Sequence, residues 1–105
     1  MNRGEIYWAD LGPAGRRPAL VVTRSGAIAV RTRVTVAPVT RTIRGIRSEV
    51  SLGTDEGLPA ESVATCDNLL TVDKRVFDSS SVGRLSTSKV VALDAALRFA
   101  LGIRY

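Results

Sequence analysis

The residue types in this 105-residue chain restrict its chemistry before any motif is considered. Histidine is absent, so a Ser-His-Asp triad, a histidine zinc site and a two-histidine nuclease are all excluded. There is also no Cys/His cluster, no calcium-binding EF-hand loop and no glycine-rich Walker loop. Any catalysis must therefore use arginine, hydroxyl groups or carboxylates, and we expect no metal and no cofactor.

Arginine dominates the charge of the chain. It supplies 13 of the 15 basic residues, and the net charge is +5. Residues 1–48 carry nine arginines against two acids, whereas residues 49–105 carry six bases against eight acids. The planar guanidinium fork matches phosphate, so the pattern favours a polyanionic partner such as nucleic acid. A merely solvated basic face is the alternative.

The length predicts a single domain spanning residues 1–105. Its core must be small, so dimerisation would usefully bury more surface. The chain has no run of 18 apolar residues, so no transmembrane helix is predicted, and its first residues lack the apolar region of a signal peptide. The single cysteine, Cys66, cannot form an internal disulfide, and we expect it to be a small buried side chain. These features indicate a cytoplasmic protein with no membrane association.

Alternating apolar residues predict a series of short strands. They are expected at residues 5–11, 18–24, 33–39, 48–52 and 62–66, with 69–72 extending or following the last of them. Turn residues separate them at 12–15, 25–26 and 53–59. The basic segment 41–47 is predicted to be a hairpin tip, and 76–81 is ambiguous.

The end of the chain has helical periodicity. Its apolar residues recur at steps of three and four, at Val90, Leu93, Leu97 and Leu101. Ser86 or Ser88 can cap the start of this helix, and Gly102 can end it. The predicted fold class is therefore mainly β with a C-terminal α-helix, a small, partly open barrel with the helix packed on it.

Five segments, in order and at matching spacing, resemble the MazF/PemK toxins of type II toxin–antitoxin systems. They are the opening strand 3–11, the Arg-Pro-hydrophobic motif at 17–22, the Pro-x-Thr ending of 36–40, the region 62–72, and the closing segment 83–103. The resemblance implies an SH3-like barrel and a homodimer. It also implies a metal-independent endoribonuclease that cuts single-stranded RNA at short sequences and so inhibits translation and growth. The implied antitoxin would block the toxin with a disordered, acidic tail.

The resemblance assigns catalytic roles to Arg17 and Thr40. The ribose 2′-hydroxyl attacks the adjacent phosphate in this family, leaving 2′,3′-cyclic phosphate and 5′-hydroxyl ends. A guanidinium at Arg17 can bind two phosphate oxygens as their charge grows, and the stiff Thr40 can donate one hydrogen bond. Asp67 is a possible catalytic base or substrate-binding residue. Relatives with that aspartate carry arginine two positions earlier, where this chain has Thr65.

Three further arginines, Arg16, Arg41 and Arg44, are predicted to contact RNA phosphates. The segment 12–16 is shorter than in many relatives, which would leave the RNA groove more open.

Two other functions fit the same barrel. A CcdB-like gyrase-binding toxin without nuclease activity is suggested by the ending Gly102-Ile103, although Leu101 stands where that family has tryptophan. A non-catalytic nucleic-acid-binding barrel is the second. The Arg17-Pro18 and Pro-x-Thr motifs favour the nuclease.

Overall fold

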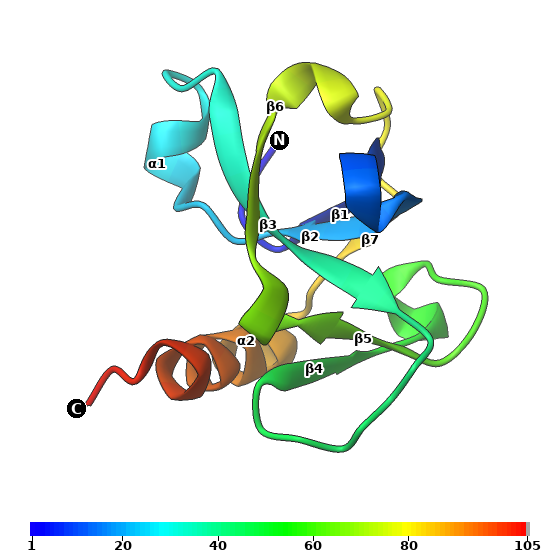
Figure 1. Cartoon of the computed structure of the whole chain (residues 1–105), viewed down its shortest axis with the longest axis vertical. Coiled ribbons are helices and arrows are strands. Elements are labelled where there is room, and N and C mark those ends of the chain that lie inside the picture. The colour runs from blue at the N-terminus through cyan, green and yellow to red at the C-terminus, as the bar shows by residue number, and fades with distance from the viewer. Residues whose placement is uncertain (105) are drawn as a thin grey trace.

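The computed structural model describes residues 1–104 and shows a curled sheet with one long helix beside it (Figure 1). The strands are β1 (Glu5–Asp10), β2 (Arg16–Val21), β3 (Arg33–Thr40), β4 (Glu49–Leu52), β5 (Ser62–Thr65), β6 (Leu70–Asp73) and β7 (Gly83–Arg84). The helices are α1 (Ser25–Ile28) and α2 (Thr87–Leu101), with short 3₁₀ turns η1 (Gly12–Ala14), η2 (Thr54–Glu56), η3 (Cys66–Asn68) and η4 (Lys74–Val76).

The strands are antiparallel and lie in the order β4-β5-β3-β2-β1-β7. The long strand β3 has a third neighbour, because its first half pairs with β6 while its last two residues pair with β5. This change of partner along one strand curls the sheet on itself. The predicted small, partly open SH3-like barrel, mainly β with a C-terminal α-helix, is confirmed.

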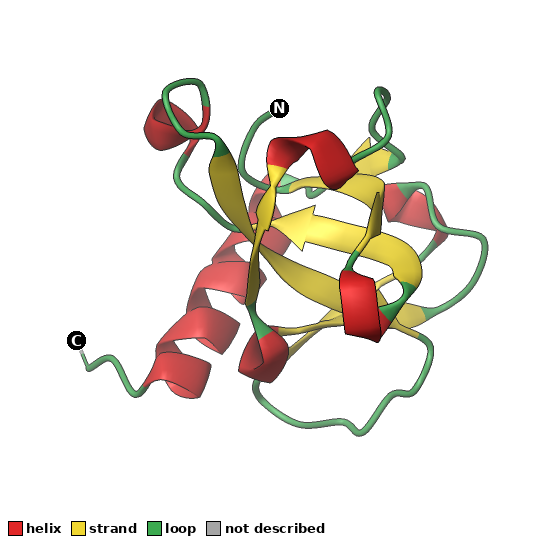
Figure 2. Cartoon of the chain, turned by 45° about the horizontal axis from the view of Figure 1, so that its top comes forward, coloured by secondary structure: helices red, strands yellow, loops and turns green. Residues whose placement is uncertain are grey.

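The sheet is buried on both faces. One core cluster joins Ile6 and Leu20 to Leu93 of α2, and a second lies on the other side, around Val21 and Val36. Burial on both faces explains why residues 19–22 form a continuous apolar run rather than an alternating one. Figure 2 shows α2 lying along one side of the strands.

The helix α2 begins and ends as the sequence predicts. The Ser86 hydroxyl, rather than that of Ser88, accepts the Lys89 N–H at the first turn. Gly102 ends the helix with φ +69°, a left-handed conformation that glycine adopts without a side-chain clash. The helix contacts β4 and η3, so it fixes the turn that carries Cys66 and Asp67.

One local prediction is wrong. The segment 41–47 is not a hairpin tip, because β3 and β4 do not pair; both pair with β5, which lies between them. The predicted break at 25–26 is confirmed, since no strand crosses it, and it holds the short helix α1, whose Ala27 and Ile28 side chains are buried. The ambiguous segment 76–81 begins in η4 and then follows β1, where the Asp78 N–H donates to the Trp8 carbonyl (2.9 Å).

No helix within residues 1–104 is both long and apolar enough to span a bilayer.

Candidate functional site

Strand register brings Arg17 and Thr40 together. Ala19 of β2 lies opposite Pro38 of β3. Arg17 is two residues before Ala19 and Thr40 is two residues after Pro38, so antiparallel strands carry both to the same end. Successive residues on a strand alternate between faces, so a step of two also keeps both side chains on one face. Both side chains line one pocket.

Arg17 is half-buried and incompletely paired. Its Nε atom is shielded from solvent and has no hydrogen-bond partner within residues 1–104. Leaving a buried donor unpaired costs about 1–3 kcal/mol, so folded proteins rarely keep one without a reason. The Arg17 side chain lines a pocket with other polar groups, and no hydrogen bond or ion pair engages its terminal N–H groups within residues 1–104, so these can meet a bound anion.

The Thr40 hydroxyl is held in place but can still donate. Its oxygen accepts the Thr42 N–H at 3.1 Å, which fixes the side chain and leaves the hydroxyl proton for a ligand. The neighbouring hydroxyl of Thr65 donates to the Pro38 carbonyl at 3.0 Å and ties β5 to β3. Thr65 is therefore occupied in the wall of the pocket.

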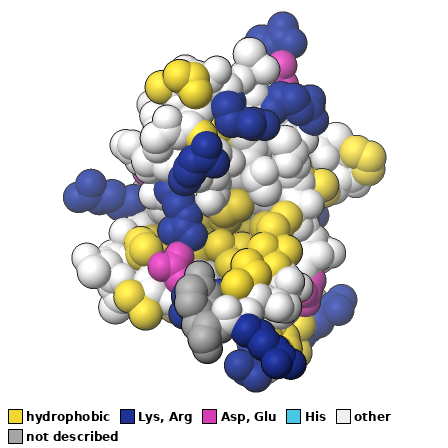
Figure 3. Space-filling model, turned by 90° about the vertical axis from the view of Figure 1, so that its left-hand side faces the viewer, with side chains coloured by type: hydrophobic (Ala, Val, Ile, Leu, Met, Phe, Trp, Pro, Cys, Tyr) yellow, Lys and Arg dark blue, Asp and Glu magenta, His cyan; other side chains and the backbone are white. Residues whose placement is uncertain are grey.

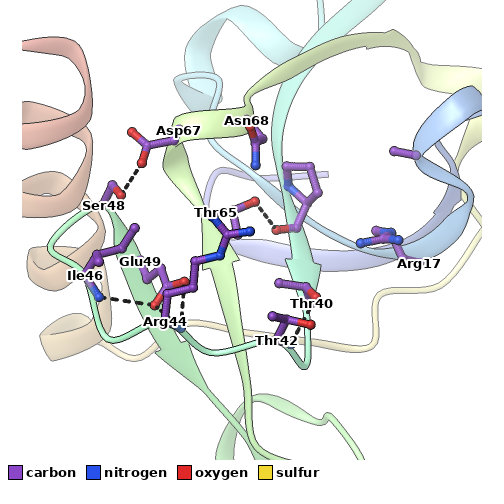
Figure 4. A pocket seen from close by; sticks show the side chains of 12 residues that line it. Arg17, Thr40, Thr42, Arg44, Ile46, Ser48, Glu49, Thr65, Asp67 and Asn68 are labelled. Carbon is purple, nitrogen blue, oxygen red and sulfur yellow. Dashed lines mark hydrogen bonds between the residues drawn. The ribbon is translucent and has the colours of Figure 1, made fainter.

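The pocket is an open cavity of about 460 Å³ (Figure 4). Its lining comes from β2, β3, β5, η1, η3, the segment between β3 and β4, and the first residue of β4. The lining residues are Ala14, Arg17, Pro38, Thr40, Thr42, Arg44, Ile46, Ser48, Glu49, Thr65, Asp67 and Asn68. Four residues singled out from the sequence thus share one site: Arg17, Thr40, Asp67 and Arg44.

Asp67 lies on the side of the pocket away from Arg17 (Figure 4). The hydroxyl of Ser48 donates to its Oδ2 atom. Ser48 is 1% exposed, and its carbonyl also accepts the Cys66 N–H (2.9 Å), so it is anchored to η3 twice. The Asp67 side chain is exposed, in contrast to the serine that holds it.

Glu49 organises the segment that carries Arg44. Its carboxylate accepts the backbone N–H groups of Arg44, Gly45 and Ile46, the shortest of these bonds being 2.9 Å to Gly45. Three successive N–H groups converging on one carboxylate fix the curve of this loop. The loop in turn carries the Arg44 side chain to the pocket (Figure 4).

Arg16 and Arg41 lie outside the pocket lining. Arg16 forms an ion pair with Asp78 (2.6 Å) and lies 5.7 Å from the centre of the Trp8 ring. The Asp78 carboxylate raises the pKa of Arg16 through a hydrogen bond and its charge. Arg41 is exposed in the segment after β3. The structure thus separates these two arginines from Arg44, with which the sequence groups them.

Cys66 belongs to the core rather than to the pocket. It is 2% exposed and packs in the cluster that contains Leu93 and Ala96, so the predicted buried position is confirmed. Burial raises the pKa of its thiol to about 11, and the Asp67 charge adds to the effect. A buried thiol of this pKa is a poor nucleophile. Among residues 1–104 there is also no group of three or more acidic, Cys or His side chains placed to hold a metal.

Sequence reasoning missed Ser48, Glu49 and Asn68. Ser48 and Glu49 follow a basic loop and read as the start of a strand, with nothing local to mark them as anchors. Their role depends on η3 and the 41–47 loop coming together, which is a tertiary event. Asn68 follows Asp67 and could have been linked to it, but the pair reads as an ordinary turn.

Comparison with known proteins gives a consistent picture. Residues 2–101 match the family model described as PemK-like, MazF-like toxin of type II toxin–antitoxin system. The chain is 39% identical over 101 residues to the probable endoribonuclease MazF5 of Mycobacterium tuberculosis, covering 94% of this chain and 91% of that protein. It is 40% identical over 93 residues to endoribonuclease MazF3 of the same species, covering 88% and 86%.

Solved structures agree with this. The Mycobacterium tuberculosis toxin MazF-mt6 superposes with a TM-score of 0.89 at 35% identity, covering 96% of this chain and 99% of that one. A mycobacterial endoribonuclease solved in complex with its cognate antitoxin superposes with a TM-score of 0.88 at 28% identity, covering 100% and 98%.

Proposed function

The chain belongs to the family of PemK-like, MazF-like toxins of type II toxin–antitoxin systems, and from this premise we propose that it is an endoribonuclease that cuts single-stranded RNA with Arg17 and Thr40. The relatives MazF5 and MazF3 are named endoribonucleases. We extend their activity to this chain because the Arg17 guanidinium in its pocket can bind a phosphate.

One observation carries the proposal: the Arg17 guanidinium, which no hydrogen bond or ion pair engages within residues 1–104, lines the same pocket as Thr40 at the same strand end. A phosphate that enters the pocket meets a guanidinium whose charge has no partner there. Arg17 then presents two N–H groups to the non-bridging phosphate oxygens, and the Thr40 hydroxyl presents one more.

The reaction needs no atom that RNA and water do not supply. The ribose 2′-oxygen bonds to the adjacent phosphorus and loses its proton, while the bond from phosphorus to the 5′-oxygen breaks and that oxygen takes up a proton. The products are a 2′,3′-cyclic phosphate and a 5′-hydroxyl. Charge on the phosphate oxygens is highest in the transition state, so donors already fixed in place accelerate this step.

The proposal includes partners. The small core favours a homodimer, and apolar side chains remain exposed on α2 and beyond it: Val91 61%, Phe99 48%, Leu101 58% and Ile103 49%. Figure 3 shows apolar side chains gathered on the face where α2 ends. A cognate antitoxin with a disordered acidic and apolar tail would cover the arginines and the apolar surface together. The place of action would be the cytoplasm, where RNA is translated.

The test is an RNA digest with analysis of the product ends, run in EDTA. A nuclease leaves cyclic phosphate and 5′-hydroxyl ends without added metal. Intact RNA together with inhibition of gyrase would support the CcdB-like alternative. Intact but bound RNA would support a non-catalytic barrel. Cleavage that requires added Mg²⁺ would contradict the proposed chemistry.

A further inference from the structure

The pocket has two ends of different chemistry. Arg17 and Thr40 lie at one end, while Asp67, held by Ser48, lies at the other, with Thr65 between them in Figure 4. The Thr65 hydroxyl is already bonded to the Pro38 carbonyl. A nucleotide chain with a phosphate at Arg17 can therefore extend a base toward Asp67.

Asp67 is an acceptor that is fixed but not neutralised. The Ser48 hydroxyl donates to its Oδ2 atom, and a backbone hydrogen bond from the Cys66 N–H to the Ser48 carbonyl holds the turn that carries Asp67. Within residues 1–104, the ion pairs join other acids to their partners, and none involves Asp67. Its Oδ1 atom has no hydrogen bond there and the side chain is exposed, so it faces whatever enters this end.

A carboxylate can only accept hydrogen bonds, which makes it selective among bases. Adenine, cytosine and guanine each present an exocyclic amino group on the Watson–Crick edge, which single-stranded RNA leaves available. Uracil has no amino group: its Watson–Crick edge offers the single donor N3–H, and the carbonyl oxygens on either side of it repel a carboxylate that approaches. Resting on the proposed RNA cleavage, we infer that Asp67 selects a base with an exocyclic amino group and disfavours uracil at one position of the cleavage site.

The neighbours of Asp67 complete such a base site. The Asn68 amide and the Arg44 guanidinium both line the pocket and can donate to the ring nitrogens or carbonyl oxygens of the same base. Donors beside an acceptor match the mixed edge of an amino-bearing base. Pro38 adds an apolar surface in the same lining.

The direct test sequences the cut sites in a random RNA library. We expect the wild-type protein to disfavour uracil about tenfold at one fixed position. Asp67→Asn supplies an amide donor for a uracil carbonyl, so the preference at that position should fall below about twofold or reverse. Ser48→Ala should give an intermediate loss, because the carboxylate remains but is no longer oriented. Asp55→Asn, an exposed aspartate outside this pocket, should leave the preference unchanged.

Three outcomes would overturn the inference. Asp67→Asn could slow cleavage of all sequences equally with the preference intact, which would make Asp67 a catalytic base. The wild-type protein could cut RNA and accept uracil at every position. The third outcome is a binding result. Oligocytidylate and oligouridylate with 2′-O-methyl groups cannot be cleaved, and their rings differ only on the Watson–Crick edge, so equal affinity of the protein for both would refute selection by Asp67. This binding measurement also tests the inference if the protein cuts no RNA at all, a result by which the proposed function itself would fail.

Discussion

The pocket and the contact between η2 and β7 both join segments that are distant in sequence. Side chains make the contacts around the pocket, whereas backbone atoms make the contact between η2 and β7. In the pocket, side chains meet around open space and Arg17 keeps a buried donor unpaired. At the other contact, backbone lies on backbone: a Cβ atom at Gly57 would collide with the Val82 carbonyl, and one at Gly83 would collide with the Glu56 carbonyl. The first arrangement leaves room for a ligand, and the second leaves no room even for a methyl group.

The comparison teaches where activity and stability are separated in this small domain. Polar groups that the fold does not need for its own hydrogen bonds are available for a substrate. Closely packed backbone contributes to stability and offers nothing to bind. Substitutions in the pocket should therefore change activity and spare stability, whereas those at the glycine contact should do the reverse.

Arg17→Ala should have the largest effect. Removing one donor to the charged transition state typically slows an enzyme by about 10²–10³-fold, and we expect that loss in cleavage of a short RNA. The free energy of unfolding should change by less than about 1 kcal/mol, because an unpaired buried donor is removed along with some packing. Single-turnover cleavage and chemical denaturation measure the two effects.

Arg17→Lys is the matched control. It keeps the positive charge but loses the two-pronged donor, so its activity should stay well below that of the wild type. Cleavage by Arg17→Ala at the wild-type rate would remove Arg17 from the active site.

Gly57→Ala should be the most destabilising change. Gly57 has φ +85°, which costs an alanine about 1–2 kcal/mol, and the collision with Val82 adds about 1–3 kcal/mol of overpacking. Gly102→Ala separates the two causes, because Gly102 has a similar φ of +69° with nothing within 4 Å. A smaller loss of stability is expected there, measured by the same denaturation. Equal losses in both variants would show that the backbone contact contributes nothing.

The fold was largely predictable from sequence because its signals are local. Alternating apolar residues indicate the strands, and Ser86 and Gly102 mark the ends of α2. The error occurred where tertiary contacts override local preference. Nothing in the segment 41–47 shows that β5, later in the chain, would lie between β3 and β4.

The site was predictable only in part. The family motifs pointed to Arg17, Thr40 and Asp67, and strand register explains why the first two meet. Nothing in the sequence marks Ser48 and Glu49 as residues that hold the pocket. Their hydrogen bonds to Asp67 and to the 41–47 loop form only when these segments come together in the folded chain. Arg16 was grouped with Arg44 by charge alone, and charge does not show that Asp78 already neutralises Arg16.

Glu49→Ala tests whether the pocket depends on the order of its loop. Without the carboxylate, three backbone N–H groups lose their acceptor, and the 41–47 loop should open locally. We expect amide hydrogen exchange at Gly45 and Ile46 to accelerate about tenfold, which corresponds to about 1.4 kcal/mol of local stability. Exchange in β2 should not change, and Asp55→Asn provides a control away from the loop. Unchanged exchange at Gly45 would show that the loop is held by other contacts.

The smallest expected effect separates Arg44 from Arg16. Each phosphate neutralised by a single-stranded RNA site contributes about 0.7 to the slope of log affinity against log salt. Arg44 lines the pocket, so Arg44→Ala should reduce the slope by about 0.7, measured with uncleavable 2′-O-methyl RNA. Arg16 is paired with Asp78, so Arg16→Ala should leave the slope unchanged. The same loss in both variants would mean that bound RNA displaces Asp78 and extends past the pocket along β1. The prediction from sequence that Arg16 contacts RNA would then be correct, and the RNA-binding region would include Arg16 as well as the pocket.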